Sequence, residues 1–466
     1  MLAARRAVAT VLAPSIRARL GALTTIVMLT ILALCAAGAG ALVAPPGART
    51  VARGVLTDRR PLRTPVVASA VAPAVASDKK RVLLLMSDTG GGHRASAKAL
   101  VNALDELYPG RVEADIVDIW TDHSCWPYSN FVPWYQIAAK RTWIWRIIWY
   151  YGRFYPSRKL QELTSRWQCF EKFRDCISDH APDMVVSVHP LCQDIPLRAL
   201  EELDGGSRTT PFVTVVTDLG SAHNTWFHKR TDYTFVPSDA LYEMGSRCGL
   251  DESKLRLRGL PLREGFWTAE SRSKEEVRAA LGLEGGRPTA LVVGGGDGVG
   301  GIAKVAIACG DDLGDAGEEA GLVVVCGKNE AVKADLEARD WPPNVKPTIL
   351  GFVQNMDEWM AAADCIVTKA GPGTIAEAAT RGLPCLLSSH LPGQEYGNVK
   401  FVEGNGFGAF VKKPKKIAET LTRWLTRAGE REAMQKEALR AARPNATLDI
   451  ARDIGGLLFD GKAPEP

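Results

Sequence analysis

The sequence predicts an α/β protein built from two Rossmann-like halves that face a cleft. After Lys79, short apolar runs alternate with segments of helical periodicity, a pattern typical of parallel sheets. These apolar runs fall into two series, and a stretch rich in glycine and charge separates them. The length of 466 residues accommodates two large domains.

The expected strands divide the chain into domains. The first series comprises Val82–Met86, Met184–Val188, Phe212–Val216 and Thr234–Val236. The second comprises Ala290–Val293, Leu322–Cys326, Thr348–Leu350, Cys365–Val367 and Cys385–Ser388. We therefore assign residues 79–262 to an N-terminal domain, 263–286 to a linker and 287–466 to a C-terminal domain. Whether the last helix crosses back to the N-terminal domain stays open.

Composition excludes several classes of protein. Hydrophobic residues make up 46% and charged residues 24%, which is typical of a globular chain and excludes a disordered or multi-span membrane protein. Ten cysteines without a CxxC pair indicate a reducing compartment. Residues 79–466 hold 48 basic and 51 acidic residues, a net charge of −3, so no nucleic-acid partner is expected.

Residues 1–78 resemble a targeting segment. No acidic residue precedes Asp58, and 29 uncharged residues separate Arg19 from Arg49. An apolar run followed by small residues is typical of a secretory signal, and the arginine-bearing tail to Arg63 is typical of a transit peptide. In tandem, the two resemble the bipartite presequence found in algae with secondary plastids. A retained membrane anchor is the alternative, because the apolar run is long enough to span a bilayer.

The first glycine motif contains a candidate base. Gly90, Gly91 and Gly92 follow an expected strand and precede the expected helix Ala95–Leu107, so their backbone N–H groups can approach an anionic ligand. His93 lies at this turn, where a helix N-terminus keeps an imidazole neutral and able to accept a proton. The alternative is a glycine-rich turn with a helix-capping histidine.

A second glycine cluster covers residues 294–301. It contains a formal GxGxxG through Gly296, but this pattern is weak alone. The next expected strand ends in Gly327 and Lys328 rather than in an acidic residue, which disfavours a dinucleotide cofactor. No Walker A motif occurs, so a P-loop ATPase is also disfavoured.

The third motif is the most specific. Gly371, Gly373 and Thr374 open a helix whose free N–H groups suit a diphosphate, and Glu377 follows one turn later, where it would accept bonds from ribose hydroxyls. Phe352, after an earlier strand, could hold a flat base. The segment 392–398 supplies carboxylate and amide groups that suit sugar hydroxyls. Three polar loops at successive strand ends converge on one crevice.

Together, these motifs resemble those of a known family. GGGHRASA at Gly90–Ala97, KAGPGTIAEA at Lys369–Ala378 and PGQE at Pro392–Glu395 are similar to monogalactosyldiacylglycerol synthase, a plastid-envelope relative of the MurG glycosyltransferase. The similarity also covers TDLGSAHNTWFHK at Thr217–Lys229, whereas MurG-like proteins lack the block Asp118–Pro156. Tyr396 and the N-terminus depart from the family.

The resemblance implies a GT-B fold, UDP-galactose as donor, 1,2-diacylglycerol as acceptor and inversion at the anomeric carbon. It implies that His93 is the catalytic base. Asp88 and Asp218 also follow strands and are rival bases. The implied donor-binding residues are Gly296, Phe352, Val353, Lys369, Gly371, Pro372, Gly373, Thr374 and Glu377, and the implied galactose-binding residues are Gln394, Glu395 and Asn398. Pro127 and Trp226 match positions linked to an anionic activator lipid, phosphatidylglycerol or phosphatidic acid, and could equally be packing residues.

An inverting transferase needs one base and an anchored leaving group, but no enzymic nucleophile. No Asp-x-Asp occurs in the sequence, so neither a metal nor another cofactor is expected for the chemistry. The charge of the departing UDP would be met by the helix N-terminus at Gly371–Thr374. Arg263 and Lys369 are candidate helpers, although a solvated surface role is an equal alternative.

The segment Trp120–Lys159 predicts membrane docking. It holds six of the twelve tryptophans, and no acidic residue lies between Ser124 and Gln161. Aromatic rings and cations together are typical of peripheral docking on anionic lipid. The docking candidates are Trp143, Trp145, Trp149, Lys140, Arg141 and Arg146, and the alternative is a buried aromatic cluster.

Three functional classes remain. The leading one is a peripheral galactolipid synthase of the plastid envelope, and whether it forms a homodimer stays open. The second keeps the fold but uses UDP-glucose with diacylglycerol, or UDP-GlcNAc with a polyprenyl-linked acceptor. The third is a non-catalytic protein that binds a UDP-sugar or a lipid.

Overall fold

Two parallel sheets organise the chain. The computed structural model describes residues 79–139, 142–268, 272–294 and 301–465. The N-terminal sheet has the order β2 (Val112–Asp118), β1 (Lys80–Met86), β3 (Met184–Ser187), β4 (Phe212–Val215), β5 (Tyr233–Val236) and β6 (Leu255–Leu257). The C-terminal sheet has the order β12 (Gly408–Phe410), β11 (Cys385–Ser389), β10 (Cys365–Lys369), β7 (Thr289–Val293), β8 (Ala320–Val325) and β9 (Val345–Leu350). The prediction of two Rossmann-like halves is confirmed.

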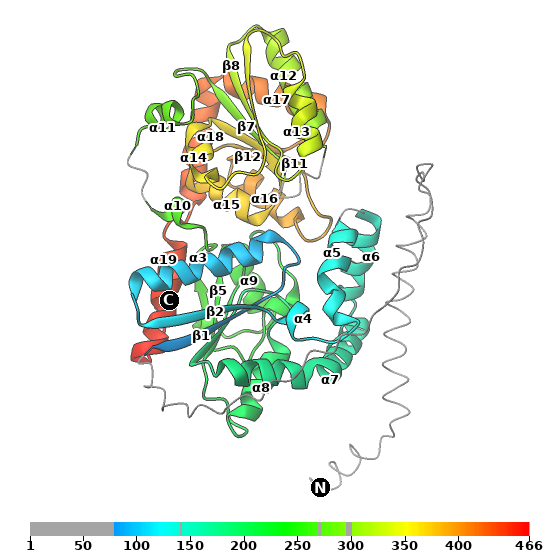
Figure 1. Ribbon diagram of the computed structural model, residues 1–466, viewed down its shortest axis with the longest axis vertical. Coiled ribbons are helices and arrows are strands. Elements are labelled where there is room, and N and C mark those ends of the chain that lie inside the picture. Colours follow the sequence, from blue (N-terminus) through cyan, green and yellow to red (C-terminus); the bar gives the residue numbers. More distant parts are fainter. Residues whose placement is uncertain (1–78, 140–141, 269–271, 295–300, 466) are drawn as a thin grey trace, which may run out of the picture.

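Helices connect the strands and cover both sheets (Figure 1). Those of the N-terminal half are α3 (Gly91–Leu107), α4 (Ile119–Asp122), α5 (Phe131–Ala139), α6 (Thr142–Arg153), α7 (Tyr155–His180), α8 (Asp194–Leu203) and α9 (Asp239–Arg247). Those that follow are α10 (Glu264–Trp267), α11 (Lys274–Ala280), α12 (Ile302–Ala316), α13 (Glu330–Glu337), α14 (Met356–Ala362), α15 (Pro372–Thr380), α16 (Tyr396–Gly404), α17 (Pro414–Thr426), α18 (Ala428–Ala441) and α19 (Ala446–Gly455).

Each sheet is buried on both faces, as parallel sheets require. In the N-terminal half, α3 and α19 cover one face, and α7 and α8 cover the other. In the C-terminal half, α12 and α17 cover one face, and α14, α15 and α16 cover the other. Because consecutive parallel strands point the same way, the loops after β1, β4, β10 and β11 gather at carboxyl edges, where α/β proteins bind ligands.

The last helix packs against the first domain. Ile450, Ala451 and Ile454 of α19 belong to the same core as the strands under α3, and Figure 1 shows α19 beside α3. The Thr447 hydroxyl donates to the Leu262 carbonyl at 2.9 Å and accepts from the Leu262 N–H at 2.8 Å. The chain therefore crosses between the halves twice.

The segment 263–286, which the sequence presents as a linker, forms the short helices α10 and α11 in its described parts. Phe266 packs in the core of the C-terminal half, whereas its neighbour Trp267 packs in the core of the N-terminal half. These two adjacent side chains anchor the connection in both domains.

Candidate functional site

His93 lies in the first turn of α3, directly after the glycine turn. Its Nδ1 is 3.0 Å from the Val188 carbonyl oxygen and 2.8 Å from the Thr217 hydroxyl. A carbonyl only accepts hydrogen bonds, so Nδ1 carries the ring proton. The lone pair of a neutral His93 is therefore on Nε2, the atom that can accept a proton from a substrate.

Burial lowers the pKa of His93 to about 4, while its bond to Val188 and the Asp88 carboxylate act in the opposite direction. The imidazole is therefore neutral at physiological pH, as a base must be before it reacts. His189 packs edge-on against it, with ring centroids 4.7 Å apart. Burial also lowers the pKa of His189, so this neighbouring ring is neutral as well. The Asp88 carboxylate is the nearby charge that raises the pKa of His93.

The N-terminus of α15 presents free amides. Gly371 is its N-cap, and the first helical bond runs from the Ile375 N–H to the Gly371 carbonyl. The N–H groups of Gly373 and Thr374 precede that bond, and Pro372 has no N–H. A Cβ at Gly373 would meet no atom within 4 Å, so this end of the helix is open to a ligand. The geometry suits an anion such as a diphosphate.

Glu377 is paired in this structure. Its Oε1 accepts from the Arg263 guanidinium at 3.0 Å, so the predicted ribose ligand is paired with Arg263, which the sequence offered as a candidate helper. Burial raises the pKa of Glu377, and Arg263 opposes that shift. One carboxylate oxygen is thus engaged by an arginine beside the open N-terminus of α15.

The base-binding candidates lie at the end of β9. Phe352 is 63% exposed, and Val353 packs partly against the C-terminal core. An exposed aromatic ring at a strand end provides a surface on which a flat base can stack. Gly296 lies outside the described residues.

The three predicted sugar ligands lie on the loop between β11 and α16 and in the first turn of α16. Glu395 is buried, and its two oxygens accept from Lys369 Nζ at 3.0 Å and from the Leu391 N–H at 2.7 Å. Asn398 donates to the Ala370 carbonyl at 2.9 Å and accepts from the Gly220 N–H at 2.7 Å. Gln394 differs, because its Oε1 is buried without a hydrogen-bond partner.

The two halves meet at this loop. The Ser221 hydroxyl donates to the Gln394 carbonyl at 2.8 Å and accepts from the Gly397 N–H at 3.2 Å. Gly220 and Gly397 are so close that a Cβ on Gly220 would overlap the Gly397 carbonyl. The loop after β4 carries Thr217 and Asp218. It is thus hydrogen-bonded to the loop between β11 and α16, where the predicted sugar ligands lie.

Trp226 and Pro127, the candidates for an activator lipid, are both buried. Trp226 is fully enclosed, and its Nε1 donates to Asp218 Oδ2 at 2.7 Å. The Trp226 indole thus faces the buried Asp218 carboxylate and packs in the N-terminal half, and a role of Trp226 and Pro127 toward an activator lipid stays a prediction.

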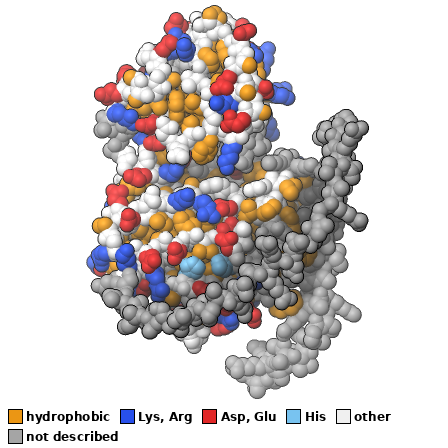
Figure 2. Space-filling model, viewed as in Figure 1, with side chains coloured by type: hydrophobic (Ala, Val, Ile, Leu, Met, Phe, Trp, Pro, Cys, Tyr) orange, Lys and Arg blue, Asp and Glu red, His pale blue; other side chains and the backbone are white. Residues whose placement is uncertain are grey.

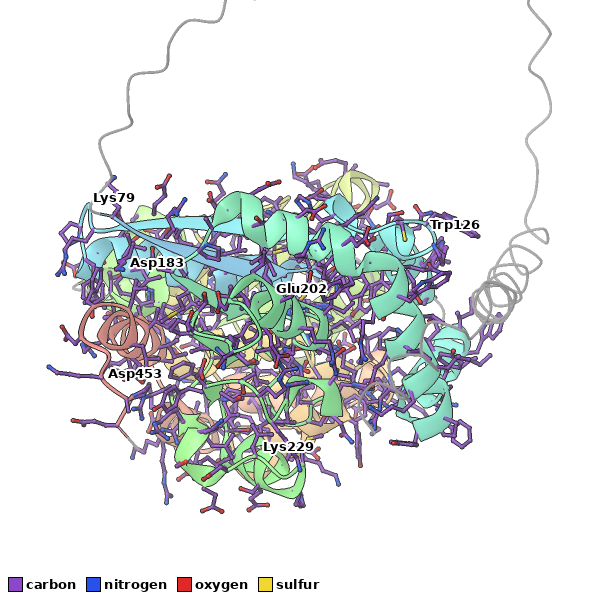
Figure 3. The ribbon with its side chains drawn as sticks, turned by 90° about the horizontal axis from the view of Figure 1, so that it is seen from below. Lys79, Trp126, Asp183, Glu202, Lys229 and Asp453 are labelled. Carbon is purple, nitrogen blue, oxygen red and sulfur yellow. The ribbon has the colours of Figure 1, made fainter. Side chains whose placement is uncertain are left out.

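Helix α6 has an outer and an inner face. Trp143, Ile147 and Tyr150 recur at helical spacing and are between 45% and 69% exposed, with Arg146 beside them. Figure 2 shows hydrophobic side chains over this part of the molecule, and Figure 3 places the exposed Trp126 at the same outer edge. Lys140 and Arg141 lie outside the described residues.

The inner face of α6 contacts the loop between β11 and α16, which is called the sugar loop because it carries predicted sugar ligands. Trp145 is 6% exposed, and its Nε1 donates to the Pro392 carbonyl at 3.0 Å. Trp149 is half-buried against His223 and Gly393. The prediction that Trp145 docks on a membrane is therefore wrong, since its ring packs against the C-terminal half. For this residue the alternative of a buried aromatic is correct.

Within the described part of the chain, no helix combines the length and the apolar character needed to cross a membrane. Among the same residues, no cluster of three or more His, Cys, Asp or Glu side chains is arranged to hold a metal ion.

Curated relatives establish the family. Monogalactosyldiacylglycerol synthase of Spinacia oleracea is 41% identical over 87% of this chain and 76% of its own length. The chain belongs to the monogalactosyldiacylglycerol synthase family. Monogalactosyldiacylglycerol synthase 1 of Arabidopsis thaliana is 40% identical over 81% of the chain and 71% of its own length, and both relatives are named chloroplastic.

Family models agree with this assignment. The monogalactosyldiacylglycerol (MGDG) synthase model matches residues 93–262, and the C-terminal domain of glycosyltransferase family 28 matches residues 289–452. The first match begins at His93, and the second contains α15 and the sugar loop. Each half of this MGDG synthase family member therefore carries one part of the candidate site.

Solved structures confirm the fold. MurG of Acinetobacter baumannii superposes with a TM-score of 0.52 at 16% identity, covering 80% of this chain and 98% of its own. MnaA of S. aureus, solved with UDP, superposes with a TM-score of 0.54 at 13% identity, covering 83% of this chain and 99% of its own. At such low identity, the likeness of this MGDG synthase family member to these proteins concerns the GT-B fold alone.

Proposed function

We propose that the chain transfers galactose from UDP-galactose to 1,2-diacylglycerol, with inversion, using His93 as the base and α15 as the anchor of the diphosphate. Family membership supports the galactosyl transfer. The contact between the loops after β4 and β11 is the observation that best supports the proposed roles of the residues. It brings the half that bears His93 and the half that bears α15 together at the carboxyl edges of their sheets.

In this mechanism, Nε2 of His93 takes the proton of the diacylglycerol hydroxyl as that oxygen attacks the anomeric carbon. The bond between this carbon and the diphosphate oxygen breaks, and UDP departs with the electron pair. The Gly373 and Thr374 amides meet the charge on UDP at the positive end of α15. Glu377 accepts from the ribose hydroxyls, and Phe352 stacks on the uracil.

Docking on the membrane follows from the outer face of α6. Trp143 and Tyr150 have the amphipathic rings that favour the headgroup region, and Arg146 supplies a positive charge for anionic lipid. We infer a peripheral association with the plastid envelope, where anionic lipids act as activators. Chloroplastic relatives support this location.

The purified chain should form galactosyl-diacylglycerol from labelled UDP-galactose and diacylglycerol vesicles, and UDP-glucose should give much less product. Since the amides of α15 hold the diphosphate, product formation should continue in EDTA. Thin-layer separation of the labelled lipid measures both results. Faster transfer from UDP-glucose, or a complete loss in EDTA that only Mg²⁺ or Mn²⁺ restores, contradicts the proposal.

Glu377→Ala should weaken UDP binding by about 1–3 kcal/mol, because the charged hydrogen bonds to ribose are lost. Titration calorimetry with UDP measures the change. Glu437→Ala, which removes a surface carboxylate on α18, is the matched control and should bind UDP as the unmodified chain does. Equal affinity in the Glu377 variant would remove this residue from the donor site.

Arg146→Gln should weaken binding to anionic vesicles by about 1 kcal/mol and leave binding to neutral vesicles unchanged. Trp143→Ala should weaken binding to both, since it removes an interfacial ring. Sedimentation with vesicles measures each, and Arg247→Gln, an exposed arginine on α9, is the charge-matched control. If Arg247→Gln has the same effect as Arg146→Gln, α6 is not the docking element.

A further inference from the structure

The Thr217 hydroxyl shares the ring proton of His93 with a backbone carbonyl. Its Oγ1 lies 2.8 Å from His93 Nδ1, and the Val188 carbonyl oxygen lies 3.0 Å from the same nitrogen. If Thr217 donated to Nδ1, the lone pair of that nitrogen would face the Val188 oxygen, which cannot donate. The hydroxyl therefore accepts from Nδ1–H and turns its own proton toward the Val188 carbonyl, 3.5 Å away.

This second acceptor on Nδ1 acts most strongly during proton transfer. When Nε2 takes a proton, the ring becomes positively charged, and hydrogen bonds from a charged donor are stronger than those from a neutral one. Burial lowers the pKa of His93 and so opposes this charge. Thr217 is 6% exposed, which makes its oxygen a fixed part of the surroundings of the ring. The hydroxyl is thus placed to stabilise the protonated base.

The residues that follow Thr217 enter the other half of the molecule. We call residues 217–221 the bridging loop. The Leu219 side chain belongs to the core of the C-terminal half, although the residue follows a strand of the N-terminal sheet. The Ser221 hydroxyl donates to the Gln394 carbonyl at 2.8 Å. The bridging loop therefore contacts the base at one end and the C-terminal half at the other.

We propose that Thr217 is a positioning residue that holds Nδ1 of His93, and that the bridging loop keeps Thr217 in place through its contacts with the C-terminal half. This inference rests on the proposed function, because it takes His93 as the base. Separation of the halves would withdraw Leu219 and Ser221 from their contacts and release the loop that carries Thr217. Efficient proton removal therefore requires the half that bears α15 to be in contact with the half that bears the base.

A pair of substitutions separates the hydroxyl of Thr217 from its shape. T217V keeps the shape and removes the acceptor, so kcat should fall about 10- to 100-fold, the value of one hydrogen bond to a charged group. T217S keeps the hydroxyl and should retain most of kcat. The KM for UDP-galactose should stay nearly unchanged in both, since the bond acts in the transition state. Initial rates with diacylglycerol vesicles measure these values.

The matched control is T214V. Thr214 lies on β4, and its hydroxyl is buried without a hydrogen-bond partner among the described residues. This variant makes the same isosteric change one turn of chain away from the base, so its kcat should equal that of the unmodified chain. Thermal unfolding should show that all three variants are folded.

The contribution of the bridging loop is tested by S221A. Alone, this variant should lower kcat about tenfold, because it removes a hydrogen bond that holds the loop to the C-terminal half. In the T217V background, it should lower kcat no more than about twofold, since residues that act through one another are not additive.

The Nδ1–H proton of His93 reports the same contacts without turnover. In the chain labelled with nitrogen-15 histidine, its magnetic resonance signal is assigned by its absence in H93A. The signal should move upfield in T217V and in S221A, because a weaker hydrogen bond leaves the proton more shielded. It should keep its position in T217S and T214V.

Normal turnover in T217V, an equal loss of kcat in T217V and T217S, or fully multiplying effects of T217V and S221A would overturn the inference. So would an unshifted Nδ1–H signal in T217V or in S221A. Absence of galactosyl transfer in the unmodified chain would instead contradict the proposed function, and the resonance signal would still decide whether Thr217 and the bridging loop hold His93.

Discussion

Replacing His93 with alanine should lower kcat by at least about two decades and leave the affinity for UDP unchanged. A diacylglycerol hydroxyl is a weak nucleophile at neutral pH, and a positioned base contributes about 10²–10⁴-fold. His93 suits this role because the bond from Nδ1 to Val188 leaves the lone pair on Nε2. The loss is expected in the transition state rather than in donor binding.

Initial rates at saturating UDP-galactose and calorimetry with UDP measure the two effects separately. His180→Ala is the matched control, since His180 ends α7 at the opposite edge of the N-terminal sheet and binds only its own helix. A folded His93 variant with near-normal turnover would exclude His93 as the base. Asp88 would then be the first alternative, followed by Asp218.

Gly220→Ala should lower kcat/KM by about 10²-fold. The added methyl group would occupy the position of the Gly397 carbonyl, so the loops after β4 and β11 must separate. Separation breaks the bonds of Asn398 and Ser221 across the interface and moves the two halves of the site apart. A displacement of about 1 Å in an active site typically costs 10²-fold in rate.

Gly429→Ala is the control for this substitution, because a Cβ there would meet no atom within 4 Å. Thermal unfolding should show that both variants are folded, and UDP affinity should be retained in both, since α15 lies within one domain. Normal transfer by Gly220→Ala would show that the observed contact between the loops is not required for catalysis.

The sequence alone predicts the central strands well and the edge strands poorly. Buried runs such as Val82–Met86 and Leu322–Val325 are continuously apolar, because parallel strands are covered on both faces. Strand β2 alternates apolar residues with Glu113 and Asp115 at an edge, so its pattern resembles exposed structure. Strands β6 and β12 have three residues each, too few for any periodicity.

The candidate site, too, could be predicted from the sequence only in part. A glycine turn before a helix determines local structure, so the positions of His93 and Gly371 could be predicted from neighbouring residues. Gly220 contacts Gly397, and Trp145 contacts Pro392, although the residues of each pair are far apart in sequence. Such contacts cannot be predicted from the pattern of neighbouring residues. The tryptophans of α6 illustrate the point, since only the tertiary contact separates the inner Trp145 from the outer Trp143.

The crossing of α19 affects the order in which the chain folds during synthesis. The N-terminal core requires Ile450 and Ile454, which are synthesised after every strand of both sheets. All strands of the C-terminal sheet lie between Thr289 and Phe410, so that sheet is complete before α19 has been made. Domains usually fold from the N-terminus as they are synthesised. Here the second domain made can fold first, whereas the core of the first domain stays incompletely covered until α19 has been synthesised.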